Sequence, residues 1–171
     1  MTAEAGRDSP RIGKSRNSEV SRDQVQRTGG LLTSVGYTAG VFDLFHVGHL
    51  NLLRQARERC GLLIVGVTSD ELAKQLKGSI PVLPLLERMM IVQSVRYVDY
   101  VIPQMVPDKS EAWQTLQFDV LFAGSNLQGT PIWEEVEQDM ERLGVHVVYL
   151  PATHLRSGRL LDRGLQDLVP D

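Results

Sequence analysis

The chain has 171 residues, of which 42% are hydrophobic and 23% charged, a balance typical of one globular domain with some additional chain. A net charge of −3 argues against a broad basic face, so we expect neither nucleic acid nor a membrane among its partners. No apolar run approaches the roughly 20 residues of a membrane span. Cys60 is the single cysteine, so no disulfide forms within the chain, and we expect a cytoplasmic protein.

The first 30 residues contain almost no large apolar side chains. Such a segment buries too little surface to offset the entropy lost on ordering. We therefore expect a disordered tail over 1–30, either a solvated extension or an arm that binds a partner, followed by one domain over 31–171.

Short apolar runs and helical periodicity alternate after Leu31. The strands expected from these runs are 31–41, 62–68, 97–102, 119–123 and 145–150. The helices expected from periodicity and caps are, in chain order, 49–60, one that starts from a capping box at Thr68 to Glu71, 85–96, 110–116, 132–143 and 157–168. This alternation predicts an α/β fold: a Rossmann-like, doubly wound parallel sheet of about five strands with helices on both faces, a three-layer α/β/α arrangement.

Ligands of such sheets lie beyond the carboxyl ends of the strands, where the strand order reverses. The segment GVFDLFHVGH, residues 40–49, occupies the first of these turns. A helix that starts near Val47 presents unpaired N–H groups and partial positive charge there. Gly48 lets a phosphate approach the backbone, and His46 and His49 would donate to that phosphate and stabilise a five-coordinate phosphorus.

Two other interpretations of the histidine pair stay open. A pair of histidines can ligate a metal, although no cysteine or carboxylate cluster accompanies this one at ligand spacing. Each histidine can also be structural, satisfied by a backbone carbonyl. The position at the ligand edge of the predicted sheet favours phosphate binding over both.

The segment resembles the H-x-G-H motif of nucleotidylyltransferases, especially the cytidylyltransferases that make CDP-glycerol, CDP-choline and CDP-ethanolamine. VGVTSDE, LKG at 76–78, ER at 87–88 and RYVDYVI at 96–102 follow in the order and spacing of glycerol-3-phosphate cytidylyltransferases. The stretch GTPIWEEVEQDMERLGVHVVYLP is similar to the carboxyl half of that family. The resemblance runs from about Val35 to Leu161.

The resemblance implies that a phosphomonoester oxygen attacks the α-phosphorus of CTP and releases pyrophosphate, with glycerol 3-phosphate as the default acceptor. It implies Mg²⁺ held mainly by the triphosphate, with no metal-ligating side chains, and catalysis by positioning and charge stabilisation. The catalytic residues implied are His46, His49 and Lys77. The nucleotide-binding residues implied are Gly40, Val41, Phe42, Asp43, Gly48, Arg88, Ser125, Arg156, Ser157, Gly158 and Arg159. The acceptor-binding residues implied are Lys77 and Arg96.

Plainer roles stand beside these. Lys77 can be a solvated loop lysine. Arg88 and Arg96 lie eight residues apart on one predicted helix, where each can pair with Glu87 or Asp99 on the surface.

Two segments depart from the family pattern. Residues 124–127 read GSNL where glycerol-3-phosphate enzymes carry G-D-D-W, so the aspartates are absent. Residues 155–160 read LRSGRL where the family has an I-S-T-T or I-S-S-T run. Arg156 and Arg159 either replace hydroxyl contacts to phosphate with charge or lie on the surface of a last helix.

Three functions follow in order of preference: a cytidylyltransferase, an adenylyltransferase that uses ATP, and a non-catalytic nucleotide-binding domain. A domain that had lost turnover would have little reason to keep both His46 and His49, which counts against the third. The family resemblance also implies a homodimer, with 96–102 as a contact.

Overall fold

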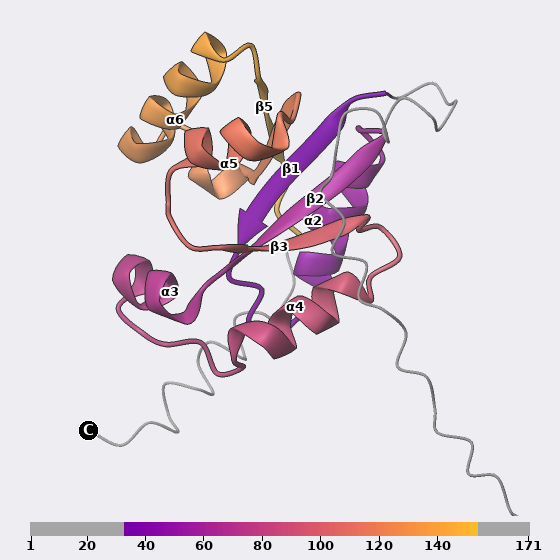
Figure 1. Ribbon diagram of the computed structural model, residues 1–171, viewed down its shortest axis with the longest axis vertical. Helices are drawn as coiled ribbons and strands as arrows, with labels where there is room; N and C mark the ends of the chain where they lie inside the picture. The colour runs from indigo at the N-terminus through magenta and orange to yellow at the C-terminus, as the bar shows by residue number, and fades with distance from the viewer. Residues whose placement is uncertain (1–32, 154–171) are drawn as a thin grey trace, which may run out of the picture.

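The computed structural model describes residues 33–153. They form a five-stranded, all-parallel sheet in the order β3-β2-β1-β4-β5 (Figure 1). The strands are β1 (Val35–Gly40), β2 (Leu62–Thr68), β3 (Tyr100–Gln104), β4 (Val120–Gly124) and β5 (His146–Leu150). The helices are α2 (Val47–Arg57), α3 (Asp70–Lys77), α4 (Leu85–Gln93), α5 (Lys109–Leu116), the 3₁₀ turn η1 (Ser125–Leu127) and α6 (Pro131–Arg142).

Helices cover both faces of the sheet, which confirms the predicted three-layer fold (Figure 1). α2 and α4 pack on one face around a core that includes Leu53, Val65 and Val92. α5 and α6 pack on the other face around Tyr37 and Met140. The central strands are buried on both faces, which explains why their sequences are continuous apolar runs.

The strand order reverses between β1 and β4. From β1 the chain passes through α2 to β2 and then β3, and it crosses back through α5 to β4 and β5 on the other side. The carboxyl ends of β1 and β4 therefore diverge into a crevice. This is the position at which open α/β sheets bind ligands.

Several predicted element boundaries are wrong. Thr68 does not open a capping box, because it is the last residue of β2 and its hydroxyl donates to Oε1 of Gln104 (2.9 Å). Ser69 caps α3 instead and accepts from the N–H of Leu72 (3.1 Å). The helix predicted over 85–96 ends at Gln93, so Arg96 lies beyond it.

The predicted tail (1–30) and last helix (157–168) lie outside the described residues. Within 33–153, no helix combines the length and apolar character needed to cross a membrane.

Candidate active site

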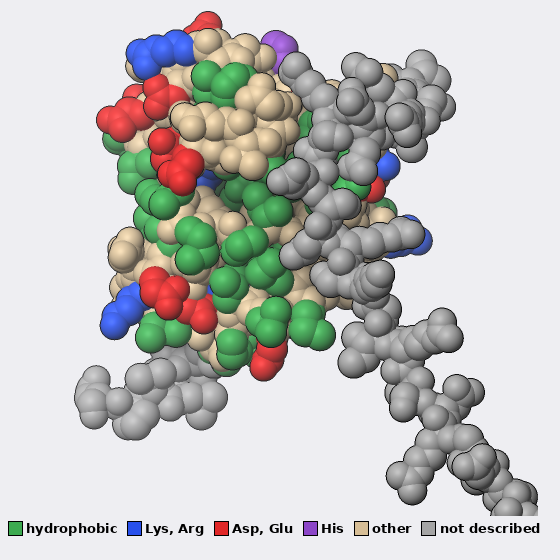
Figure 2. Space-filling model, viewed as in Figure 1, with side chains coloured by type: hydrophobic (Ala, Val, Ile, Leu, Met, Phe, Trp, Pro, Cys, Tyr) green, Lys and Arg blue, Asp and Glu red, His purple; other side chains and the backbone are tan. Residues whose placement is uncertain are grey.

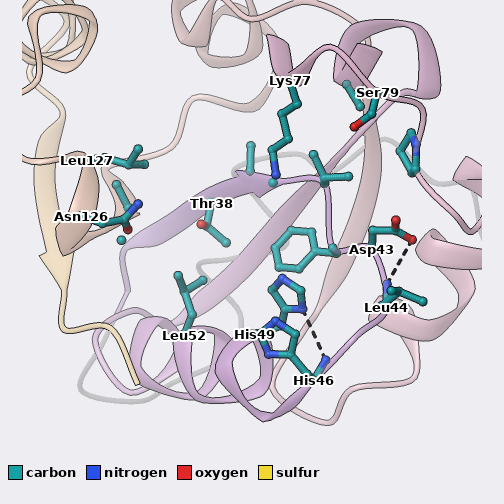
Figure 3. A pocket seen from close by; sticks show the side chains of 18 of the residues that line it. Thr38, Asp43, Leu44, His46, His49, Leu52, Lys77, Ser79, Asn126 and Leu127 are labelled. Carbon is teal, nitrogen blue, oxygen red and sulfur yellow. Dashed lines mark hydrogen bonds between the residues drawn. The ribbon is translucent and has the colours of Figure 1, made fainter. Parts of the chain in front are cut away.

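A cavity of about 900 Å³ opens at the reversal of strand order (Figure 3). The carboxyl ends of β1 and β4 form its floor, the β1–α2 turn and α2 form one side, and α3 with the loop after it forms another. The predicted site residues that line it are Gly40, Val41, Phe42, Asp43, His46, His49 and Lys77. The structure thus brings together residues that lie up to 37 positions apart in the sequence, from Gly40 to Lys77.

His46 and His49 form a reciprocal cap at the start of α2. The N–H of Gly48 donates to Nδ1 of His46 (3.0 Å), and the N–H of His46 donates to Nδ1 of His49 (3.4 Å). An imidazole nitrogen that accepts a hydrogen bond carries no hydrogen, so each neutral ring carries its hydrogen on Nε2. The fold therefore sets the tautomer of both rings and gives each an Nε2–H donor.

The structure gives a reason for glycine at position 48 beside the approach of a phosphate that the sequence predicts. A Cβ at this position would lie 2.7 Å from Cε1 and 2.9 Å from Nδ1 of His46. Glycine therefore makes room for the capping ring of His46.

The two imidazole rings stack with centroids 4.0 Å apart. Burial lowers the pKa of the His49 imidazole to about 4; the neighbouring His46 and the positive charge of Lys77 act in the same direction, and Asp43 opposes them. At neutral pH His49 is therefore an uncharged donor. Phe42 and Phe45 pack on the same ring, with centroids 5.3 and 5.5 Å away.

The β1–α2 turn holds two non-glycine residues in left-handed backbone conformation, Phe42 (φ 53°) and Leu44 (φ 44°). Such conformations cost about 1–3 kcal/mol each and persist where the surroundings determine them. Phe42 is buried in the core, so its packing offsets part of this cost. The turn directs the backbone of Gly40 and Val41 along the cavity.

Asp43 fastens this turn to the loop between α3 and α4. Its Oδ1 accepts from the N–H groups of Leu44 and Leu83 (both 3.0 Å), and its Oδ2 accepts from the N–H of Val82 (2.7 Å). Both carboxylate oxygens are thus occupied by backbone donors. Asp43 lies in the cavity wall, and its role there is to position the loop between α3 and α4.

Arg88 corrects the sequence prediction of a surface or nucleotide-contacting arginine. Its side chain is completely buried, and it donates to the carbonyls of Val41, Thr68 and Leu83 and to the carboxylate of Asp70 (2.5 Å). It pairs with neither Glu87 nor Asp99. Arg88 lies behind the cavity wall, where it ties the β1–α2 turn to the end of β2 and to the α3–α4 loop.

The two basic residues implied for the acceptor lie at opposite ends of the strands, Lys77 at the carboxyl ends and Arg96 at the amino ends. Lys77 is the last residue of α3, and its side chain points into the cavity (Figure 3). Arg96 is exposed, precedes the amino end of β3, and donates to the hydroxyl of Tyr97 (2.7 Å). The structure therefore does not bring Arg96 to the cavity.

The departure from the family pattern after β4 has a defined geometry. Ser125 does not line the cavity, and its hydroxyl accepts from the N–H of Ala152 (3.3 Å). Asn126 lines it instead, with its side chain folded back over Gly124, where a Cβ would lie 2.6 Å from Oδ1. Arg156, Ser157, Gly158 and Arg159 lie outside the described residues.

The cavity is also lined by Asn126 and Leu127, neighbours of the predicted site residue Ser125, and by Trp133 and the loop residues Ser79 to Val82, none of which was predicted as a site residue. Trp133 stands edge-on to Tyr149, with ring centroids 6.0 Å apart. The rule that ligands lie beyond strand ends pointed to Asn126 and Leu127. Trp133 lies in the first turn of α6 and the loop follows α3, and no local pattern singled them out.

The family model for cytidylyltransferase-like proteins matches residues 37–158. The chain belongs to the cytidylyltransferase-like family. The match contains the entire described cavity, from Thr38 to Trp133.

Curated relatives match parts of this domain. The chain is 34% identical over 115 residues to the bifunctional protein HldE of Granulibacter bethesdensis, covering 67% of this chain and 24% of that protein. It is 53% identical over 66 residues to the ethanolamine-phosphate cytidylyltransferase of Arabidopsis thaliana, covering 39% of this chain and 15% of that protein. The chain thus spans about a quarter or less of these relatives.

Solved structures share the fold. A lipopolysaccharide core biosynthesis protein from Thermoplasma volcanium superposes with a TM-score of 0.61 at 22% identity, covering 70% of this chain and 96% of that one. A pantothenate synthetase from Thermus thermophilus superposes with a TM-score of 0.55 at 16% identity, covering 81% and 62%.

Proposed function

We propose that this protein is a nucleotidylyltransferase that transfers CMP from CTP to a phosphorylated alcohol and releases pyrophosphate. The observation that carries the proposal is the pair of Nε2–H donors whose tautomers the α2 cap sets, in a cavity at the reversal of strand order. Membership of the cytidylyltransferase-like family and the identity to an ethanolamine-phosphate cytidylyltransferase support the choice of CTP.

In the proposed reaction an oxygen of the acceptor phosphomonoester attacks the α-phosphorus of the nucleotide. A new P–O bond forms, the bond between the α-phosphorus and the bridging oxygen breaks, and pyrophosphate leaves with that electron pair. Negative charge grows on the non-bridging oxygens of the α-phosphate. His46 and His49 would donate to these oxygens, and the first N–H groups of α2 add partial positive charge.

Lys77 would hold the acceptor phosphate beside the α-phosphate and reduce the repulsion between the two anions. No side chain has to act as nucleophile, because the acceptor brings its own oxygen. Catalysis then consists of positioning and charge stabilisation.

Magnesium is part of the proposal as a partner of the triphosphate. Among residues 33–153, no three histidine, cysteine, aspartate or glutamate side chains cluster to hold a metal, and the oxygens of Asp43 already bind backbone donors. This donor set fits an ion carried mainly by phosphate oxygens, whose charge it would neutralise.

The test is pyrophosphate release from the full chain with Mg²⁺, either CTP or ATP, and a panel of phosphorylated alcohols that includes glycerol 3-phosphate and phosphoethanolamine. Release with CTP is the expected result. Release with ATP alone would replace the proposal with an adenylyltransferase, the second candidate. Asn126 is compatible with both bases, because its carboxamide offers a donor and an acceptor.

A non-catalytic nucleotide-binding domain is the third candidate, favoured by the neutral stretch Ser125 to Leu127 in place of acidic residues. Nucleotide binding by calorimetry without pyrophosphate release across the panel would support it.

We further propose a homodimer in the cytoplasm. β3 is an edge strand of the sheet, and the segment 96–102 that leads into it is a candidate contact. The mass of the protein in solution by light scattering tests the dimer. The single cysteine, Cys60, is a buried free thiol, which suits a reducing compartment.

A further inference from the structure

The cavity has two chemically different ends, with the histidine pair between them (Figure 3). One end presents the carboxamide of Asn126, the side chain of Leu127 and the indole of Trp133. An amide and an aromatic ring suit a planar base with hydrogen-bonding edges. The other end, at α3 and the loop after it, is therefore available for the acceptor.

The acceptor end carries one cation among the described lining residues. This is Lys77, followed by Gly78 in left-handed conformation (φ 80°), which turns the chain into the loop. An ammonium that points into the cavity is complementary to the two negative charges of a phosphomonoester. The phosphate of the acceptor then lies near Lys77, and its organic part extends over the loop.

The side chains by which that loop lines the cavity are mainly apolar. Ile80, Pro81 and Val82 line the cavity, and the side chains of Ile80 and Val82 are 61% and 54% exposed. Figure 2 shows hydrophobic side chains gathered over the part of this face where α3, α4 and the loop between them lie. Covering such side chains with an apolar ligand removes them from water, which is favourable.

Polar partners for a polyol are few at this end. Among the described lining residues, the side chains at this end with hydrogen-bonding groups are Lys77, Ser79 and Asp43. Lys77 faces the phosphate, and both oxygens of Asp43 are held by the N–H groups of Leu44, Val82 and Leu83. Hydroxyl groups of a sugar or glycerol phosphate would lose water and regain mainly the hydroxyl of Ser79, which is a net cost.

We propose that the acceptor is a phosphomonoester of an aliphatic alcohol, with its phosphate at Lys77 and its alkyl chain on Ile80, Pro81 and Val82. This rests on the proposed transfer function for the role of acceptor, whereas the binding preference rests on the cavity itself. The backbone bonds of Asp43 hold this wall in place before the ligand arrives, so little ordering is required on binding.

The test measures binding of ethyl, butyl and hexyl phosphate and of glycerol 3-phosphate to the full chain by calorimetry. Affinity should rise about fourfold for each methylene that becomes buried, and glycerol 3-phosphate should bind more weakly than butyl phosphate. The double variant Ile80→Ser, Val82→Ser should flatten this dependence on chain length. Lys77→Ala should weaken every phosphate by a similar factor and keep the dependence.

Leu86→Ser with Met90→Ser is the matched control. Both side chains are exposed and aliphatic, at 69% and 65%, and neither lines the cavity. This variant should keep the wild-type dependence on chain length. Equal affinity for all alkyl phosphates in the wild type, or equal loss in both double variants, would overturn the proposal.

Pyrophosphate release with the same acceptors separates this proposal from the transfer function. A rising affinity with chain length and no pyrophosphate from any acceptor would reject the transfer and leave the ligand class standing. Pyrophosphate from glycerol 3-phosphate in preference to butyl and hexyl phosphate would reject the aliphatic acceptor and leave the transfer standing.

Discussion

His49 accepts a hydrogen bond from the backbone N–H of His46, while His46 caps the helix on which His49 lies. Each histidine therefore fixes the position of the other. The same two bonds that begin α2 also place a hydrogen on Nε2 of each ring. Folding and the proposed chemistry use different atoms of the same side chains, so substitutions can separate them.

We predict that His46→Asn keeps the fold and loses turnover. Asparagine is among the best N-cap residues, because its side-chain oxygen accepts from the first turn, but it has no donor at the position of Nε2. Turnover should fall about 100- to 1,000-fold, as when one donor to a developing oxyanion is removed. Urea denaturation and pyrophosphate release measure the two effects.

His46→Ala is the comparison, since it removes the cap as well and should cost about 1 kcal/mol of unfolding free energy. Near-wild-type turnover in His46→Asn would rule out the donor role of His46.

The stability of the protein should depend on pH through His49. Its pKa is lowered from an unfolded value near 6.5 to about 4, chiefly by burial. Between these values the unfolded chain binds a proton that the folded chain does not, so the free energy of unfolding decreases as the pH falls from about 6.5 to 4. His49→Gln should lack this component. Urea titrations at several pH values test it, and parallel curves for the two proteins would contradict it.

Asp43→Ala should release the loop that carries Ile80 to Val82. Three backbone donors lose a charged acceptor, which costs about 1.5–3 kcal/mol for each strong bond of this kind and exposes the N–H groups of Val82 and Leu83 to exchange. Hydrogen exchange at these two amides should accelerate, and the KM for acceptor should rise. Asp139→Asn removes an exposed carboxylate that pairs with Arg142, and it should change neither quantity.

Arg88→Met should destabilise the protein by about 3–5 kcal/mol. The substitution leaves the partly exposed carboxylate of Asp70 and the carbonyls of Val41, Thr68 and Leu83 without the buried donor that joins them. Arg88→Lys should recover only part of the loss, because lysine lacks the planar fork. Denaturant unfolding measures this, with the exposed neighbour Glu87→Gln as control. A loss below about 1 kcal/mol in Arg88→Met would show that the network is dispensable.

Tyr37→Phe should be neutral or stabilising by up to about 1 kcal/mol. The Tyr37 hydroxyl is buried against Gly66, and it has no hydrogen-bond partner among the described residues. Tyr97→Phe is the control, since it removes a hydroxyl that accepts from Arg96 at the surface and should stay within about 0.5 kcal/mol. A loss above about 1 kcal/mol in Tyr37→Phe would show that a buried water satisfies this hydroxyl.

The sequence predicted β2 and β4 well because these central strands are buried on both faces. β2 matches its apolar run from Leu62 to Thr68 at both ends. The strand predicted over 97–102 begins at Tyr100 instead. Val98 is apolar because it packs in the core, yet its N–H closes a turn on the carbonyl of Val95, and burial alone does not distinguish a turn from a strand.

The site was predictable where it is local. Residues 40–49 form one turn and one helix start, so a motif of ten residues contains most of its geometry. The bonds of Asp43 to Val82 and of Arg88 to Val41 join positions 39 and 47 residues apart. Such contacts depend on how α3 and α4 fold back over the strand ends, which residue spacing does not encode.

The cap at the start of α2 changes what the histidine pair signifies in a family comparison. Selection for a stable helix alone would preserve a capping side chain at position 46, so a descendant that had lost its substrate would still have a reason to keep a polar cap there, contrary to the expectation from sequence. Drift after such a loss would first become visible as asparagine at position 46. That substitution preserves the cap and removes the donor, so it would distinguish a domain that has lost catalytic activity from an active one.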